Sequence, residues 1–132
     1  MTLSSYRISD FRKKLTEAFK LLRKDKIIAR QNFWCCQSCA CYAIEKIIKI
    51  LTEKGKTVQG YCYYHSQDNE SLQKGNSFFL AFGNALHNSV AETEKEKQTL
   101  EVGKKIVKLL NGQGIQTEWN ETSGTRIKVI TD

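Results

Sequence analysis

The sequence predicts an α+β fold, in which three helices pack on one face of a four- or five-stranded, mainly antiparallel sheet in the order α-(β)-α-β-β-α-β-β. Apolar residues recur every three or four positions in three long stretches, which is typical of amphipathic helices. Two pairs of short stretches rich in aromatic and β-branched residues lie before and after the third helix, as paired strands do. The 132 residues suffice for a core of their own, so we expect a single domain over residues 1–132.

The first helix is expected at residues 6–24. Its apolar positions share one face because they are three and four residues apart; they are Ile8, Phe11, Leu15, Ala18, Phe19 and Leu22. Residues 1–30 contain nine Lys and Arg against three Asp and Glu, which accounts for most of the formal net charge of +7. A basic helix of this kind can bind nucleic acid, although exposed Lys and Arg more often form only a solvated face.

Residues 26–33 fit either a short strand or an extended connector, because apolar residues alternate along one side. A second helix is expected to follow, with Ser38 as its N-cap and Gly55 just after its end, where positive φ is common. Its apolar arc is broad, so we expect the most buried helix of the protein. The arc consists of Cys39, Tyr42, Ala43, Ile44, Ile47, Ile48, Ile50 and Leu51.

Two strands are expected at residues 57–65 and 77–82. The first alternates regularly and is rich in aromatic residues, and the second is mostly apolar. A polar turn and a short helical piece at residues 70–74 separate them. The two strands are therefore expected to pair antiparallel.

The third helix is expected at residues 94–111, where Thr93 and Glu96 have the spacing of a capping box. Glycines just after this stretch are suited to end the helix. Residues 115–119 and 126–130 then alternate around a polar turn, which predicts a β-hairpin that closes the sheet.

Four of the five cysteines lie within seven residues, Cys35 to Cys41. Cys36 and Cys39 form a C-x-x-C motif at the start of the second helix, where free backbone N–H groups and the helix dipole stabilise a thiolate. Dithiol redox chemistry of the thioredoxin type would also need the motif in a βαβ setting and a cis-proline beside the thiols. The chain contains no proline, which argues against that chemistry.

A zinc site is a second interpretation of the same cysteines. Four-coordinate structural zinc draws its ligands from two separated pairs, and His65 is the best-placed third ligand, with Asp68 as the group that orients it. The second pair of zinc ligands is incomplete in this sequence. The predicted metal ligands are therefore Cys36, Cys39 and His65. The simplest interpretation is that the cysteines are small, buried apolar side chains.

No complete catalytic or ligand-binding signature is present. We therefore expect a small soluble protein that acts as a non-catalytic binding or interaction domain, with a metal-binding or thiol-dependent enzyme as the alternative and nucleic-acid binding through the first helix as a third hypothesis. No apolar run reaches the roughly 18 residues that a membrane span needs, and no signal peptide is apparent at the N-terminus. A cytoplasmic location is expected, where cysteines stay reduced.

Several blocks occur in a characteristic order: Asn-Phe-x-Cys-Cys with Ser-Cys, Gly-Tyr-x-x-Tyr-His-x-Gln-Asp, Phe-Gly, Glu-Trp-Asn and Arg-Ile-Lys-Val. Together they resemble an uncharacterised bacterial family known only as a domain of unknown function, over about residues 32–129. This chain has Ala40 and Glu121 at two positions where the family commonly has glycine. The resemblance implies no known activity. The matching positions are Asn32, Phe33, Cys35, Cys36, Ser38, Cys39, Gly60, Tyr61, Tyr64, His65, Gln67, Asp68, Phe82, Gly83, Glu118, Trp119, Asn120, Arg126 and Ile127.

Overall fold

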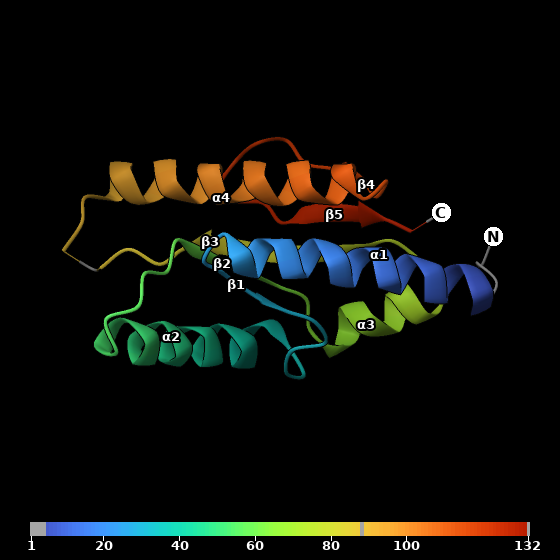
Figure 1. Ribbon diagram of the computed structural model, residues 1–132, viewed down its shortest axis with the longest axis horizontal. Coiled ribbons are helices and arrows are strands. Elements are labelled where there is room, and N and C mark those ends of the chain that lie inside the picture. Colours follow the sequence, from blue (N-terminus) through green and yellow to red (C-terminus); the bar gives the residue numbers. More distant parts are fainter. Residues whose placement is uncertain (1–4, 88, 132) are drawn as a thin grey trace.

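The computed structural model describes residues 5–87 and 89–131, and within them it shows four helices and five strands (Figure 1). The α+β class is confirmed, but the predicted number of three helices is wrong by one, because the short helical piece expected after the first long strand is a helix of its own. The elements are α1 (Ser5–Lys24), β1 (Ile27–Arg30), α2 (Gln37–Glu53), β2 (Gly60–Tyr63), α3 (Ser66–Gln73), β3 (Phe78–Asn84), α4 (Glu92–Gly112), β4 (Gln116–Glu118) and β5 (Ile127–Ile130).

The five strands form one sheet in the order β1-β2-β3-β5-β4. The predicted antiparallel pairing of β2 with β3 and the closing β4–β5 hairpin are confirmed. The stretch that fitted either a strand or a connector is β1, and it pairs parallel with β2. Parallel neighbours cannot be joined by a tight turn, so α2 serves as the crossover between them and the N-terminal part of the sheet is a β1-α2-β2 unit.

The helices lie on both faces of the sheet, so the expected placement on one face is wrong. In Figure 1, α4 and α2 lie on opposite sides of the strands, and α1 shares one core with α4 whereas α2 covers the other. The reason lies in the strands, whose alternate residues point to opposite faces. Cys62 of β2 and Tyr64, the residue after the strand, belong to the core under α1 and α4, whereas Tyr63 belongs to the core under α2. Both sides of β2 are apolar and both need a cover.

Helix α2 is not the most buried helix, contrary to the expectation from its broad apolar arc. Only Ala40 and Ile44 are buried, and Tyr42 and Ile50 are 61% and 50% exposed. A helix that packs on a sheet from one side buries a single stripe, so the rest of the arc faces outward. The basic helix α1 is buried more completely; its fully enclosed side chains are Leu15, Ala18, Phe19 and Leu22.

The helix starts differ from those expected. Helix α2 begins at Gln37 with Cys36, in extended conformation, as its N-cap, so Ser38 lies inside the helix. Helix α4 begins at Glu92 after Ala91, and no side chain caps it, so the predicted capping box is wrong. Acidic side chains in the first turn of α4 interact favourably with the helix dipole without a cap. Gly55 follows α2 with a φ of +76°, as expected.

The two positions at which the resemblance implies glycine, Ala40 and Glu121, behave differently in the structure. Ala40 is buried in the first turns of α2, where alanine is a good helix former. Glu121, in the β4–β5 turn, has a φ of +59°, which costs a non-glycine residue about 1 kcal/mol. The backbone of this turn therefore has a conformation that glycine adopts without strain.

Candidate metal centre

The connection between β1 and α2 is held against the end of β2 by two backbone hydrogen bonds. The Phe33 N–H donates to the Tyr64 carbonyl (2.8 Å), and the Ser66 N–H donates to the Trp34 carbonyl (2.9 Å). Trp34 has a φ of +65°, which is rare for a bulky residue and recurs at ligand-binding segments. The connection is thus pinned in a specific shape directly before the cysteines.

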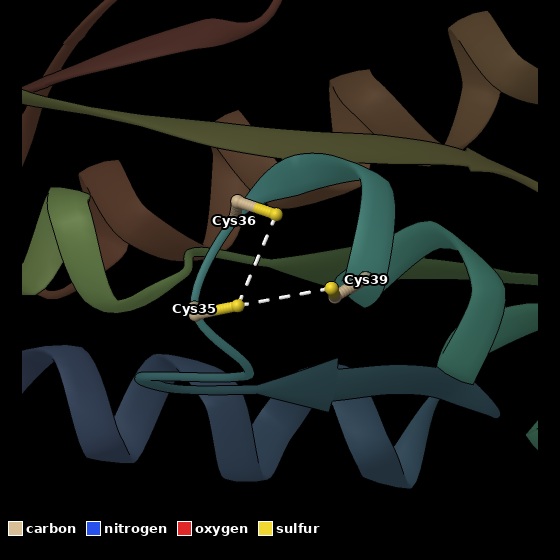
Figure 2. A group of neighbouring side chains, drawn as sticks. All are labelled: Cys35, Cys36 and Cys39. Carbon is tan, nitrogen blue, oxygen red and sulfur yellow. Dashed lines mark hydrogen bonds between the residues drawn. The ribbon is translucent and has the colours of Figure 1, made fainter.

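Three cysteine sulfurs lie together where this connection enters α2. Figure 2 shows the side chains of Cys35, Cys36 and Cys39 pointing toward one another from the loop and the first turn of the helix. Cys35 Sγ lies 3.9 Å from Cys36 Sγ and 3.7 Å from Cys39 Sγ, and all three sulfurs are within 4.8 Å of one another. All three are free thiols, with Cys35 exposed and the other two partly exposed. We call them the thiol cluster.

The thiols of Cys36 and Cys39 differ in acidity. The pKa of Cys36 is lowered, first by the backbone N–H of Cys39 at the helix start and then by hydrogen bonds with the Cys39 and Cys35 thiols. The pKa of Cys39 is raised to about 11, mainly because its thiol is hydrogen-bonded to the sulfurs of Cys36 and Cys35. Cys36 therefore ionises before Cys39, and the Cys39 proton leaves readily only when a cation replaces it.

The two sulfur separations from Cys35 match those of a metal–thiolate centre. Zn²⁺ bonds to thiolate sulfur at about 2.3 Å in a tetrahedron, which places two sulfurs about 3.8 Å apart, close to the observed 3.9 and 3.7 Å. Among residues 5–87 and 89–131, no His, Asp, Glu or further Cys places a donor atom within the same group. The cluster thus offers three protein ligands and one open position.

The structure brings Cys36 and Cys39, two of the predicted site residues, together with Cys35. Cys35 is absent from the predicted ligand set because it lies outside the C-x-x-C motif that Cys36 and Cys39 form. The Cys35 to Cys39 spacing of four residues was the available indication, since residues four apart across a helix start can face each other. His65 is not a member of the thiol cluster, and its role as a ligand stays a prediction.

His65 and Asp68 form a buried pair at the start of α3, as the N-cap and third residue of a capping box. Asp68 Oδ2 lies 3.3 Å from His65 Nε2 and accepts the His65 backbone N–H at the same distance. The imidazole approaches the backbone of Asp68 as in a capping box, but its buried Nδ1 has no hydrogen-bond partner of good geometry. Asp68 therefore orients the imidazole, which is the relation proposed from the sequence.

Arg126, which is not among the predicted site residues, completes this group. Its Nη1 lies 3.6 Å from Asp68 Oδ2, and its guanidinium stacks over the Phe79 ring, 5.1 Å from the centroid. Asp68 Oδ1 accepts the Phe79 backbone N–H at 3.4 Å. One carboxylate thus ties α3 to β3 and to the residue that precedes β5. The only indication of Arg126 in the sequence was its place in the Arg-Ile-Lys-Val block that resembles the family.

Replacing Asp68 with alanine is expected to lower the free energy of unfolding by about 2 kcal/mol, because it leaves buried polar groups without a partner. Urea denaturation followed by circular dichroism measures the change. Asp10→Ala is the matched control, because Asp10 is exposed and its ion pair with Lys14 contributes at most about 0.5 kcal/mol. Equal losses in the two variants would contradict a structural role for Asp68.

The basic residues of α1 lie on its exposed side, and part of their charge is paired within the helix. Lys14 lies 3.4 Å from Asp10, and Lys20 lies 3.3 Å from Glu17. Such exposed pairs are weak, so they leave the positive character of the helix largely intact. Binding of nucleic acid by α1 stays a prediction.

The fold and the thiol cluster define an α+β domain with a potential thiolate metal centre. Residues 8–132 match a family model described as "Domain of unknown function (DUF6891)", and the chain belongs to that family, which confirms the resemblance noted in the sequence. The searches of curated proteins and of solved structures found no match. Within the described residues, no helix combines the length and apolar character needed to cross a membrane.

Proposed function

We propose that this protein is a metal-binding domain that holds a zinc ion through Cys35, Cys36 and Cys39. The observation that carries the proposal is the agreement between the sulfur separations of 3.9 and 3.7 Å and the roughly 3.8 Å expected around tetrahedral zinc. The start of α2 adds a favourable field, because its free N–H groups stabilise thiolate charge. The protein is thus a binding domain without catalysis, and its ligand is a metal ion.

His65 is the group we propose for the open fourth position. The hydrogen bond between the Ser66 N–H and the Trp34 carbonyl brings the start of α3 beside the loop that carries the cysteines. Asp68 next to His65 Nε2 favours a proton on that nitrogen and leaves a lone pair on the unpartnered Nδ1. Histidine ligands of zinc are commonly oriented by a carboxylate in this way. A water molecule is the alternative fourth ligand.

The test is the zinc affinity of the untagged, reduced protein, measured by competition with a chromophoric chelator at pH 7. We expect one zinc per chain, and a loss of at least about 100-fold in affinity, or about 2.7 kcal/mol, for Cys35→Ser, Cys36→Ser and Cys39→Ser. Cys41→Ser is the matched control, because its sulfur contacts the Tyr63 hydroxyl at 3.1 Å instead of the cluster. Absence of stoichiometric zinc, or equal affinity in all variants, would refute the proposal.

A reduced cytoplasm is the location that suits this proposal. All five cysteines are free, and free thiols persist where glutathione and thioredoxin keep them reduced. A thiolate centre also needs its sulfurs unoxidised in order to bind metal.

Dithiol redox chemistry is a second candidate, which one structural observation favours. The C-x-x-C motif follows β1 and opens α2 within the parallel β1-α2-β2 unit, the setting that thioredoxin-like enzymes use. In this candidate the Cys36 thiolate attacks a substrate disulfide and forms a mixed disulfide. Cys39 then displaces the substrate as a dithiol and closes a Cys36–Cys39 disulfide. The missing proline still argues against it.

The pH dependence of alkylation tests this candidate. Because its pKa is lowered from the ordinary value of 9.0, Cys36 is expected to react with iodoacetamide at a lower pH than Cys39, whose pKa is raised to about 11. Mass spectrometry of peptides locates the modified thiol. If Cys36 shows an ordinary pKa, or if the protein fails to accelerate reduction of insulin disulfides by dithiothreitol, the redox candidate is rejected and the zinc proposal is unaffected.

A further inference from the structure

We infer that the thiol cluster binds trivalent arsenic and antimony, delivered as their oxyacids, through three sulfur bonds. This inference rests on the proposed function, because it requires that Cys35, Cys36 and Cys39 act together as thiolate ligands. It goes beyond the zinc proposal because it states that the cluster also selects trivalent arsenic and antimony. The protein would then be a receptor for trivalent metalloids.

The number of ligands is the first support. The described residues provide three converging sulfurs and no fourth donor atom in the same group. Zinc in a protein centre needs a fourth ligand to complete its tetrahedron. Trivalent arsenic forms three bonds and carries a lone pair on its remaining side, so three thiolates complete its coordination. Soft thiolate sulfur is also the ligand that such soft ions prefer.

The arrangement of the sulfurs is the second support. Two bonds of about 2.3 Å to a shared centre can join sulfurs that are at most about 4.6 Å apart. The measured separations from Cys35 Sγ, 3.9 and 3.7 Å, lie within that limit. Figure 2 shows the three sulfurs pointing toward one another, and all of them lie within 4.8 Å of one another, so the side chains converge on one place where a single central atom would sit.

Access and preorganisation are the third support. Cys35 is exposed and its two neighbours are partly exposed, so a small solute reaches the cluster from solvent. The loop is held by the hydrogen bonds that join Phe33 to Tyr64 and Ser66 to Trp34. A site that is already ordered loses less conformational entropy on binding.

The binding step is a ligand exchange without any change of oxidation state. Arsenous acid is neutral at pH 7, and each cysteine thiol displaces one of its three hydroxyl groups. In each exchange an S–As bond forms, an As–O bond breaks, and the thiol proton leaves with the hydroxyl as water, so three waters are released. The product carries no charge, whereas zinc with three thiolates carries one negative charge.

The experiment uses the reduced full chain with sodium arsenite as the probe. Native mass spectrometry is expected to show one arsenic per chain with the loss of three protons, which counts three S–As bonds. Cys35→Ser, Cys36→Ser and Cys39→Ser are each expected to weaken arsenite binding by at least 100-fold, while Cys41→Ser leaves it unchanged. Arsenite should also displace zinc, because both use the same sulfurs. Circular dichroism checks that each variant is folded, and Cys35→Ala provides a second replacement at the exposed position.

The outcomes separate this inference from the zinc proposal. If zinc binds and arsenite does not, or if arsenite binds with the loss of only two protons, the inference is wrong and the zinc proposal stands. Arsenite binding that is unchanged in Cys35→Ser and Cys35→Ala also overturns the inference. If neither zinc nor arsenite binds, both are wrong.

Discussion

Replacing Tyr64 with alanine is expected to lower the free energy of unfolding by about 4 kcal/mol, within the range for buried aromatic residues. Tyr64 is 1% exposed. Its ring packs edge-on against Phe19 and Phe78, with centroids 6.2 and 5.1 Å away. Alanine leaves a cavity between α1 and the sheet that rigid neighbours cannot fill. Urea denaturation followed by circular dichroism measures the loss.

Tyr64→Phe is the matched control for this prediction. It keeps the ring and removes only the hydroxyl, which donates to Gln31 Oε1 at 2.9 Å. The expected loss is about 1 kcal/mol. If the two variants lose equal stability, Tyr64 stabilises the protein through its hydrogen bond and not through the packing of its ring.

Replacing Gly60 with alanine is expected to cost about 3 kcal/mol, at the upper end for overpacking. An added Cβ would lie 2.5 Å from the Gly83 carbonyl oxygen and 2.5 Å from Val102 Cγ2. The side chain of Val102 can rotate, but the carbonyl belongs to the β2–β3 ladder, where Tyr61 pairs with Gly83. The clash is therefore relieved only by moving β2 away from β3.

Gly112→Ala is the control, because a Cβ added at that position meets no atom within 4 Å. Gly112 is the last residue of α4, and alanine favours the helix over glycine by up to about 1 kcal/mol. Differential scanning calorimetry of both variants is expected to show a lower melting temperature for Gly60→Ala only. A similar melting temperature in both would show that the sheet tolerates a side chain at Gly60.

Local sequence patterns were enough to locate most of the helices and strands. The three-and-four spacing in α1 and the alternation in β2 depend on neighbours close in the chain, and the structure confirms them. The predicted start of α4 at residue 94 is wrong because it relied on the capping-box spacing of Thr93. The helix begins earlier, at Glu92, where acidic residues in its first turn interact favourably with the helix dipole. The burial of α2 was overestimated because apolar content does not tell how much of a helix the rest of the protein covers.

The candidate site was only partly predictable. Cys36 and Cys39 followed from the C-x-x-C spacing, and the pairing of His65 with Asp68 followed from their separation of three residues at a strand end. Cys35 joins the cluster only because the loop turns at Trp34 and is held by hydrogen bonds to Tyr64 and Ser66, between β2 and the start of α3. Arg126 reaches Asp68 from a distant segment, and no local pattern reports such a contact.

The sequence by itself determined the α+β class, the positions of the amphipathic helices, the closing hairpin and the concentration of thiols at a helix start. These depend on periodicity and on the properties of residues within one turn or one strand. Only the tertiary structure decided that β1 pairs parallel with β2, that α2 covers the opposite face from α1 and α4, and that three sulfurs converge. The physical reason is that pairing partners and covered faces result from contacts between residues far apart in the chain, which compete for the same apolar surfaces and are resolved only when the whole core packs.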